Sequence, residues 1–193
     1  ATHQFDSTGR ILLPNSNFGV YIGHLVGDGN GAFGNVALGF KAFEVNQTSI
    51  NNVGIGTQSL GLLRTANANA AVGAYSMYHN ITGASNTALG YAAGYGNASD
   101  SLTGQQNVFV GRETGYSLST GSNNTFLGYQ AGYSATTSSG NVFLGSNAGR
   151  NETADSLLYI ENSNSSTPVI YGDFAEDSLR FNGVVETSSN LYV

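Results

Sequence analysis

The chain contains no cysteine and no tryptophan among its 193 residues, and it has one methionine and two prolines. Without cysteine it can form neither a disulfide bond nor a thiolate metal site, so its stability must come from packing or from assembly. No apolar run approaches the roughly 18 residues of a membrane-spanning helix, and no secretory signal pattern is present. We therefore expect no membrane insertion by this segment. Because it opens on Ala1 rather than methionine, we expect it to be part of a longer protein.

Charged residues are also scarce. They make up 9% of the chain, compared with about 25% in ordinary soluble domains. The formal net charge is -6, and the six lysine and arginine residues are spread along the chain without forming a basic patch. Nucleic acids and anionic membranes select basic surfaces, so neither is expected as a partner.

Glycine, asparagine, serine and threonine are abundant, and there are 27 glycines in the chain. This composition favours tight turns and short strands over helices. The predicted class is therefore all-β.

A five-residue motif organises the central part of the chain. It reads Asn, a small or β-branched residue, then Ala, Gly or an aromatic residue, then Ile, Leu or Val, then Gly, and the first of its eight copies begins with Gly19. The closing glycines are separated by 16, 17, 17, 17, 21, 17 and 17 residues. The repeated residues are Asn35, Asn52, Asn69, Asn86, Asn107, Asn124 and Asn141, and Gly23, Gly39, Gly56, Gly73, Gly90, Gly111, Gly128 and Gly145.

This period has room for two strands of about five residues and two turns, which is one coil of a β-solenoid, whereas helical repeats need about twice that length. We predict a parallel β-roll of about eight coils over residues 19–150. Residues 1–18 are expected to cap the first coil, because open solenoid ends present unpaired edges. Residues 151–193 are expected to form a β-rich connector and trimerisation segment.

Side chains alternate along a strand, so the second and fourth motif positions share one face and the third lies on the other. The fourth position is always Ile, Leu or Val, and we assign its face to the interior of the roll. The third position becomes aromatic at Phe109, Phe126 and Phe143. We expect this column to be buried between chains, because an exposed aromatic column would be a sizeable apolar patch and a thin coil has little core of its own.

The motif asparagine is suited to a turn, since asparagine tolerates the left-handed conformation, and identical amides one coil apart can form ladders. Charged residues at that position would stack about 4.8 Å apart and repel, which accounts for the low charge. Three residues after each closing glycine the side chain is nearly always small. We expect the coil to turn inward there.

The phrases NVALG, NTALGYAAGY, NTFLGYQAGY and NVFLGSNAG resemble the head repeats of trimeric autotransporter adhesins of the Yersinia adhesin type. They are also similar to repeats in bacteriophage tail fibres and in surface fibres of predatory bacteria. The resemblance covers roughly residues 19–150, although the period here is longer than is usual in the adhesin heads. It implies a left-handed parallel β-roll from each of three chains around a threefold axis. The implied location is extracellular, on a cell-surface fibre or a virion tail fibre.

Residues 151–193 have strand-like runs at Leu157 to Glu161, Val169 to Asp173, Ser178 to Phe181 and Val184 to Glu186, with a hairpin signal at Asn182-Gly183. The phrase SLLYIENSNSSTPVIYGDFAEDSLRFNG resembles the segment that lies before an endosialidase-type intramolecular chaperone in many fibre proteins. That resemblance favours a phage-like fibre.

Few residues could support catalysis. The three histidines have no metal-ligand spacing and no neighbouring nucleophile elbow. The acidic residues of the repeat region are scattered rather than paired as in glycan-cleaving enzymes. We expect a non-enzymatic protein with no metal and no other cofactor.

Tyrosines supply most of the candidate ligand-binding residues. Tyr78 and three later tyrosines follow their closing glycines by five residues, so they should form a stripe. A stacked ladder that supports the coil and a platform for sugar rings both fit such a stripe. A second tyrosine pair and the insertion of the longest coil add further candidates, since irregular loops on a regular scaffold often carry recognition. The candidate set is Tyr91, Tyr95, Asp100, Tyr116, Tyr129 and Tyr133.

Together these features predict a homotrimeric surface-fibre or tail-fibre segment that recognises a cell-surface glycan or envelope component. Two alternatives belong to other classes: a passive spacer that holds a distal tip away from its anchor, and a glycan-degrading tailspike. Binding to a glycan panel would support adhesion, absence of binding would favour the spacer, and released oligosaccharide would establish the enzyme.

Overall fold

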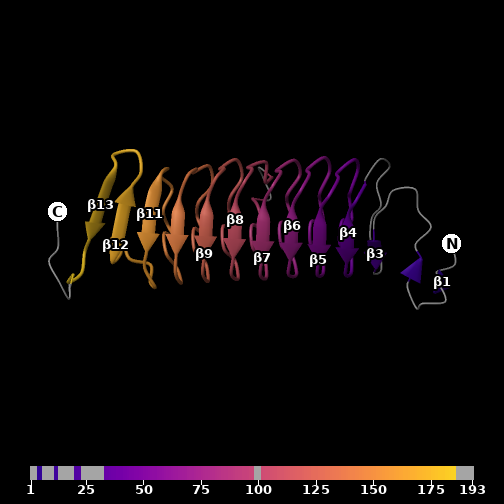
Figure 1. Ribbon diagram of the computed structural model, residues 1–193, viewed down its shortest axis with the longest axis horizontal. Helices are drawn as coiled ribbons and strands as arrows, with labels where there is room; N and C mark the ends of the chain where they lie inside the picture. Colours follow the sequence, from indigo (N-terminus) through magenta and orange to yellow (C-terminus); the bar gives the residue numbers. More distant parts are fainter. Residues whose placement is uncertain (1–3, 6–10, 13–19, 23–32, 98–100, 186–193) are drawn as a thin grey trace.

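The computed structural model of the chain describes residues 4–5, 11–12, 20–22, 33–97 and 101–185. They form a rod in which short strands lie side by side along the long axis (Figure 1). No helix occurs in these residues, so none of them could cross a membrane as a helix. The all-β prediction is confirmed, and the repeat region is a parallel β-solenoid of about seven coils.

Most strands belong to one eleven-stranded sheet in which neighbours in sequence are neighbours in space. Strands β3 to β11 pair in parallel, and β12 and β13 are added in antiparallel fashion. A separate antiparallel pair consists of β1 (Gln4–Phe5) and β2 (Ile11–Leu12). The sheet strands are β3 (Val20–Ile22), β4 (Val36–Leu38), β5 (Val53–Ile55), β6 (Ala70–Val72), β7 (Thr87–Leu89), β8 (Val108–Val110), β9 (Thr125–Leu127), β10 (Val142–Leu144), β11 (Leu157–Ile160), β12 (Ile170–Asp173) and β13 (Ser178–Phe181).

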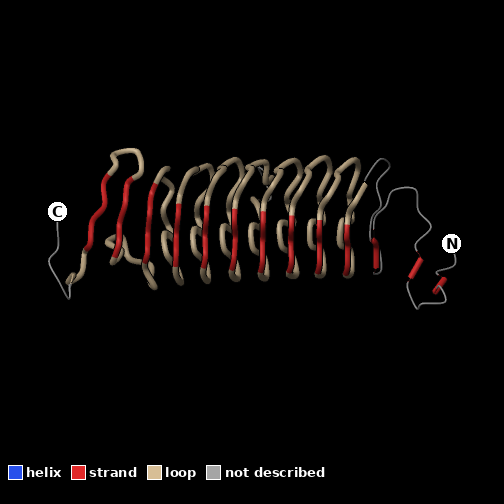
Figure 2. Tube along the Cα trace, in the orientation of Figure 1, coloured by secondary structure: helices blue, strands red, loops and turns tan. Residues whose placement is uncertain are grey.

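Each described coil has one three-residue strand, and the return half is a series of tight turns (Figure 2). The prediction of two five-residue strands per coil is therefore wrong for this part of the chain. Left-handed conformations recur at the second and fourth residues after each closing glycine, for example at Gln58 (φ 54°) and Leu60 (φ 50°). A chain that re-enters the left-handed region so often cannot extend as a strand.

The closing glycine of the motif is required by the backbone. The described closing glycines have φ between 120° and 139°, a region that side chains rarely occupy. They are also stacked closely: a Cβ on Gly73 would lie 2.3 Å from the carbonyl oxygen of Gly90. Gly23 lies outside the described residues.

The third motif position points into the coil, and the second and fourth point out. Ala37, Phe109, Phe126 and Phe143 are fully buried within a single chain, whereas the fourth-position residue Leu89 is 50% exposed. The prediction that the fourth motif position faces the interior is therefore wrong: the third position faces it instead. The prediction that the three phenylalanines lie between chains is wrong, because their own coils already enclose them. A three-residue strand directs only its middle side chain inward.

Small residues line the tight inner corner of the coil, as predicted. The residues three positions after the described closing glycines are all fully buried: Ala42, Ser59, Ser76, Ala93, Thr114, Ala131 and Ala148.

Two of the rows of side chains that fill the interior have reciprocal sizes. One row is the third motif position, and the other lies four residues after the closing glycine. Early coils pair a small strand residue with a large turn residue, as Ala71 with Met77. Late coils pair a large strand residue with glycine, as Phe126 with Gly132. The coil volume is thus conserved although the large residue changes sides.

The large residue moves from the turn row to the strand row at the coil of Ala88 and Gly94, where the residues of both rows are small. A Cβ on Gly94 would lie 3.3 Å from Cγ of Met77 and 2.5 Å from Cδ2 of Phe109. Large residues from the coils on either side therefore fill this coil.

The motif asparagines form a buried ladder, which confirms that prediction. Each Oδ1 accepts the backbone N–H of the asparagine one coil later, as from Asn52 to Asn35 (2.8 Å) and from Asn124 to Asn107 (3.0 Å). The last one, Asn141, accepts from the backbone of Leu157. The left-handed residue is the one before each motif asparagine, for example Asn51 (φ 57°), so the asparagine serves as a hydrogen-bonding residue and not as the left-handed one.

The segment after the repeats extends the same sheet. Three of the predicted runs are strands β11, β12 and β13, and β11 lies parallel to β10 like another coil. The antiparallel turn falls between Asp173 and Ser178, not at Asn182-Gly183. Asn182 instead continues the pairing by donating its backbone N–H to Val169, and residues 184 and 185 are not in a strand.

Candidate functional site

A ladder of tyrosine rings runs along the return half of the solenoid, as the spacing predicts. Tyr95 and Tyr116 are 4.8 Å apart between ring centroids with an angle of 3°, and Tyr116 and Tyr133 are 5.0 Å apart with an angle of 5°. Tyr78 joins at 5.6 Å from Tyr95, with an angle of 20°. Because each coil contributes one ring, the coil repeat itself sets the stacking distance.

Both ends of the tyrosine ladder are covered. A Cβ on Gly61 would lie 2.6 Å from the Tyr78 ring, so that ring rests on the glycine backbone. At the other end the guanidinium of Arg150 lies over Tyr133, with Cζ 4.9 Å from the ring centroid. The faces of these rings are therefore used within the chain. This geometry favours a supporting role for the stacked faces.

A second row of side chains lies beside the ladder, two residues after each closing glycine. We call it the Ala92 row, because its residue in the fourth described coil is reduced to a methyl group. Its members are Lys41, Gln58, Tyr75, Ala92, Glu113, Gln130 and Asn147. All seven have φ between 51° and 60°.

A hollow of about 300 Å³ lies above Ala92. It has the tyrosine ladder on one side and members of the Ala92 row from the neighbouring coils at its ends. Its lining residues are Tyr75, Tyr91, Ala92, Tyr95, Glu113, Tyr116 and Tyr133. The short side chain of Ala92, set between Tyr75 and Glu113 in its row, accounts for the space.

Two of the lining rings are not part of the parallel stack. Tyr75 and Tyr91 meet edge to face, with centroids 5.9 Å apart and an angle of 70°. Tyr91 is 49% exposed. The pair therefore gives the hollow a corner of aromatic carbon that the ladder does not provide.

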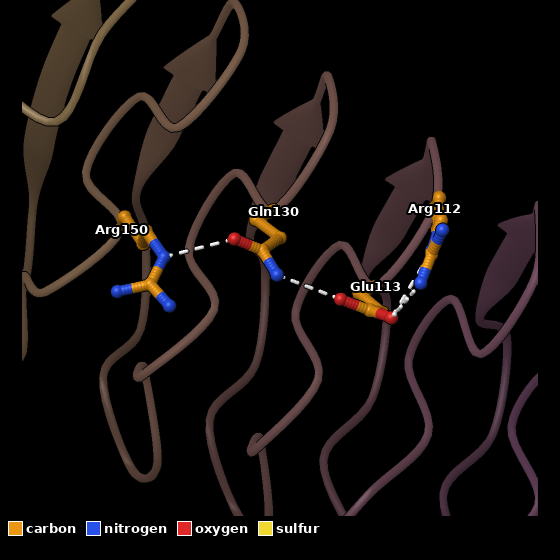
Figure 3. Close-up of polar contacts among 4 residues, drawn as sticks. All are labelled: Arg112, Glu113, Gln130 and Arg150. Carbon is orange, nitrogen blue, oxygen red and sulfur yellow. Dashed lines mark hydrogen bonds and ion pairs between the residues drawn. The ribbon is translucent and has the colours of Figure 1, made fainter.

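Two members of the Ala92 row, Glu113 and Gln130, are joined with Arg112 and Arg150 in a chain of hydrogen bonds (Figure 3). Nε of Arg150 donates to Oε1 of Gln130 (3.0 Å), and Nε2 of Gln130 donates to Oε2 of Glu113 (2.7 Å). Arg112 donates to Oε1 of Glu113 from Nε (3.1 Å) and from Nη2 (3.0 Å). Arg112 Cζ also lies 5.5 Å from the centroid of Tyr91. The carboxylate at the hollow is thus held in one orientation.

These contacts set the ionisation of the site. The hydrogen bond from Gln130, followed by Arg112, lowers the pKa of Glu113 below its usual value. Burial in the ladder raises the pKa of Tyr95 and of Tyr116. At neutral pH the hollow therefore holds one carboxylate, paired with the neighbouring Arg112 guanidinium, and the phenols of Tyr95 and Tyr116 stay protonated.

The structure brings together four of the six predicted ligand-binding residues: Tyr91, Tyr95, Tyr116 and Tyr133 all line the hollow. Tyr129 is 44% exposed but does not line it, and Asp100 lies outside the described residues. The inserted loop is anchored by Leu102, which is fully buried and pairs with Asn80.

Sequence reasoning missed Tyr75, Ala92 and Glu113. A signal was present, because Ala92 is the only alanine at its position in the described coils. An exception within a repeated row marks a place where the regular packing is interrupted.

The outward side of the sheet is a separate feature, which we call the apolar sheet face. It consists of the second and fourth motif positions, and the pairing register continues it through β13. Its most exposed members are Val20, Ile22, Ile55, Leu89, Val108, Leu127, Ile160, Leu179 and Phe181, each between 37% and 59% exposed. Eleven strands about 4.8 Å apart make this face roughly 50 Å long.

Among the described residues, no three histidine or acidic side chains lie close enough together to hold a metal ion. No protein-family model, curated protein or solved structure matches this chain. The two surface features that bear on function are the apolar sheet face and the hollow.

Proposed function

We propose that this chain is a non-enzymatic segment of a homotrimeric extracellular fibre that adheres to a cell surface through a glycan or envelope component. The observation that carries the proposal is the pairing of two unlike surfaces on one rod. One is an apolar sheet face suited to burial against copies of the same chain, and the other is a tyrosine-lined hollow suited to a ligand.

The apolar sheet face supports self-association. Soluble monomers rarely expose contiguous apolar patches of more than a few hundred Å², and this face has large aliphatic side chains in nearly every strand. A second copy of the chain offers a face of the same length and the same strand spacing, so the contact can extend along the whole rod. The arrangement of three chains is what the resemblance to the adhesin heads implies.

The hollow supports recognition. It combines aromatic carbon, phenol hydroxyls and a fixed carboxylate in a concave surface, which is the usual make-up of a small-ligand site. None of its lining residues belongs to a strand of the sheet. In a trimer, three copies of a weak site would act together and raise the apparent affinity.

A passive spacer is the second candidate, and the capped tyrosine ladder favours it. Ring faces that are stacked within the chain stiffen the rod without any ligand.

The proposal is tested by two measurements on the purified chain. Light scattering after size exclusion should give about three times the 20.0 kDa chain mass, and a glycan panel should show binding. A mass of one chain would overturn the trimer. Trimers that bind no glycan or envelope extract would support the spacer, and released oligosaccharide would contradict a non-enzymatic role.

A further inference from the structure

We propose that the hollow above Ala92 is a subsite for one uncharged pyranose ring of a glycan. This inference rests on the proposed adhesive function and names the class of ligand that the site would take.

The first argument is the shape of the Ala92 row. The coils before and after carry Tyr75 and Glu113 at this position, so Ala92 leaves space for a ring-sized group between them. Tyr75 and Tyr91 both line this space, and their rings meet at 70° to each other. A pyranose ring has an apolar face of C–H groups, and aromatic side chains offer a matching surface for such a face.

The second argument is the arrangement of polar groups. Oxygens of Glu113 and the tyrosine hydroxyls can accept hydrogen bonds from sugar hydroxyls, and the phenols can also donate. Gln130 and Arg112 already hold the Glu113 carboxylate in place. A preorganised acceptor costs little ordering when the ligand binds.

The third argument is charge. The Glu113 carboxylate lines the hollow, so a sugar carboxylate or phosphate would meet a like charge there. The same carboxylate is already paired with Arg112, so the ammonium group of an amino sugar would have to displace that guanidinium. An uncharged ring meets neither penalty.

The key variant is Ala92→Gln. Glutamine occupies this row at Gln58 (φ 54°) and Gln130 (φ 53°), so the backbone at residue 92 (φ 51°) accepts it. The longer side chain should fill the hollow and leave the solenoid intact. Asn147→Gln is the matched control, since it lengthens the same row three coils further on.

The experiment measures binding of the full chain to uncharged hexose and N-acetylhexosamine oligomers, and to sialylated and uronate-containing oligomers. We expect the wild-type chain and Asn147→Gln to bind an uncharged oligomer equally, and Ala92→Gln to bind it at least about tenfold more weakly. Glu113→Gln should also weaken binding, by about ten- to a hundredfold, because a charged acceptor is lost.

The outcomes separate the subsite from the adhesive function. If the wild-type chain binds a glycan and Ala92→Gln binds it equally well, the subsite is overturned while adhesion stands. If the wild-type chain prefers acidic oligomers, and Glu113→Gln strengthens that binding, the uncharged class is overturned. If the wild-type chain binds no glycan at all, both the subsite and glycan adhesion fail.

Discussion

The ring of Phe126 lies against the α-carbon of Gly132, so that a Cβ on residue 132 would be 2.5 Å from Cδ2 and Cε2 of the ring. In the coil of Ala71 and Met77 the sizes are reversed, with the large side chain on the turn and the small one on the strand. The two inner rows therefore share one volume, and either row can fill it.

This sharing predicts strong coupling between residues 126 and 132. Phe126→Ala should reduce the free energy of unfolding by about 3–5 kcal/mol because it leaves a cavity. Gly132→Phe alone should also destabilise, because the new side chain overlaps the Phe126 ring. The double variant should lose at least about 1 kcal/mol less than the sum of the two single changes. Chemical denaturation of all four proteins measures this, and additive losses would contradict the shared volume.

The asparagine ladder predicts a large effect from a single amide. Asn107→Ala removes the acceptor of the Asn124 backbone N–H and the donor to the carbonyl of Gly121, and both groups are buried. Each unsatisfied buried group costs about 1–3 kcal/mol, so we expect a loss of about 3 kcal/mol in unfolding free energy. Asn151→Ala, at an exposed position, should change stability by less than about 0.5 kcal/mol. Equal losses from both variants would show that a ladder asparagine contributes no more to the free energy of unfolding than an exposed one.

The apolar sheet face predicts that charge on its surface prevents assembly. Leu89 and Leu127 are 50% and 47% exposed in one chain, so the double change Leu89→Lys and Leu127→Lys should be tolerated by the coil. It should lower the mass seen by light scattering from about three chains to one chain of 20.0 kDa. Gln105→Lys, exposed in the turn before β8, serves as the control and should leave the mass unchanged. A double variant that keeps the mass of three chains would show that the interface between chains lies elsewhere.

Because of His79, we expect the stability of the folded chain to fall modestly in acid. Burial lowers the pKa of His79 in the folded chain, where the imidazole lies edge to face with Tyr78 and Tyr95. The unfolded chain therefore binds a proton at His79 more readily than the folded chain does. The free energy of unfolding is thus highest above the unfolded pKa of about 6.5 and declines as the pH falls below that value. The melting temperature of the wild-type chain should fall more between pH 7.5 and pH 5.5 than that of His79→Phe. Equal falls would show that His79 does not contribute.

Much of the fold could be predicted from the sequence, because the repeat carries it. The closing glycines gave the coil period, and the asparagines gave the ladder, since each requirement recurs in every coil. The direction of the strand side chains could not be decided by apolar content. Both faces are apolar, and the inner row of Ala37, Gly54 and Ala71 is less hydrophobic than the outer Leu38, Ile55 and Val72.

Part of the candidate site was also predictable. The five-residue offset from the closing glycine placed Tyr95, Tyr116 and Tyr133 in one stripe. The hollow beside them depends on the short side chain of Ala92. A repeat pattern identifies residues that recur, and Ala92 does not recur at its position.

The direction of the hydrogen bonds between coils has a mechanical consequence. Strands lie across the rod, so the bonds that join successive coils run along its length (Figure 1). A pulling force on the two ends of one chain loads these bonds one row at a time, as in opening a zipper. A coil of 17 residues, such as the one between Asn52 and Asn69, releases roughly 55–60 Å of extended chain when it opens. Such a rod lengthens in small repeated steps under tension and keeps its remaining coils folded while the end coils absorb the pull.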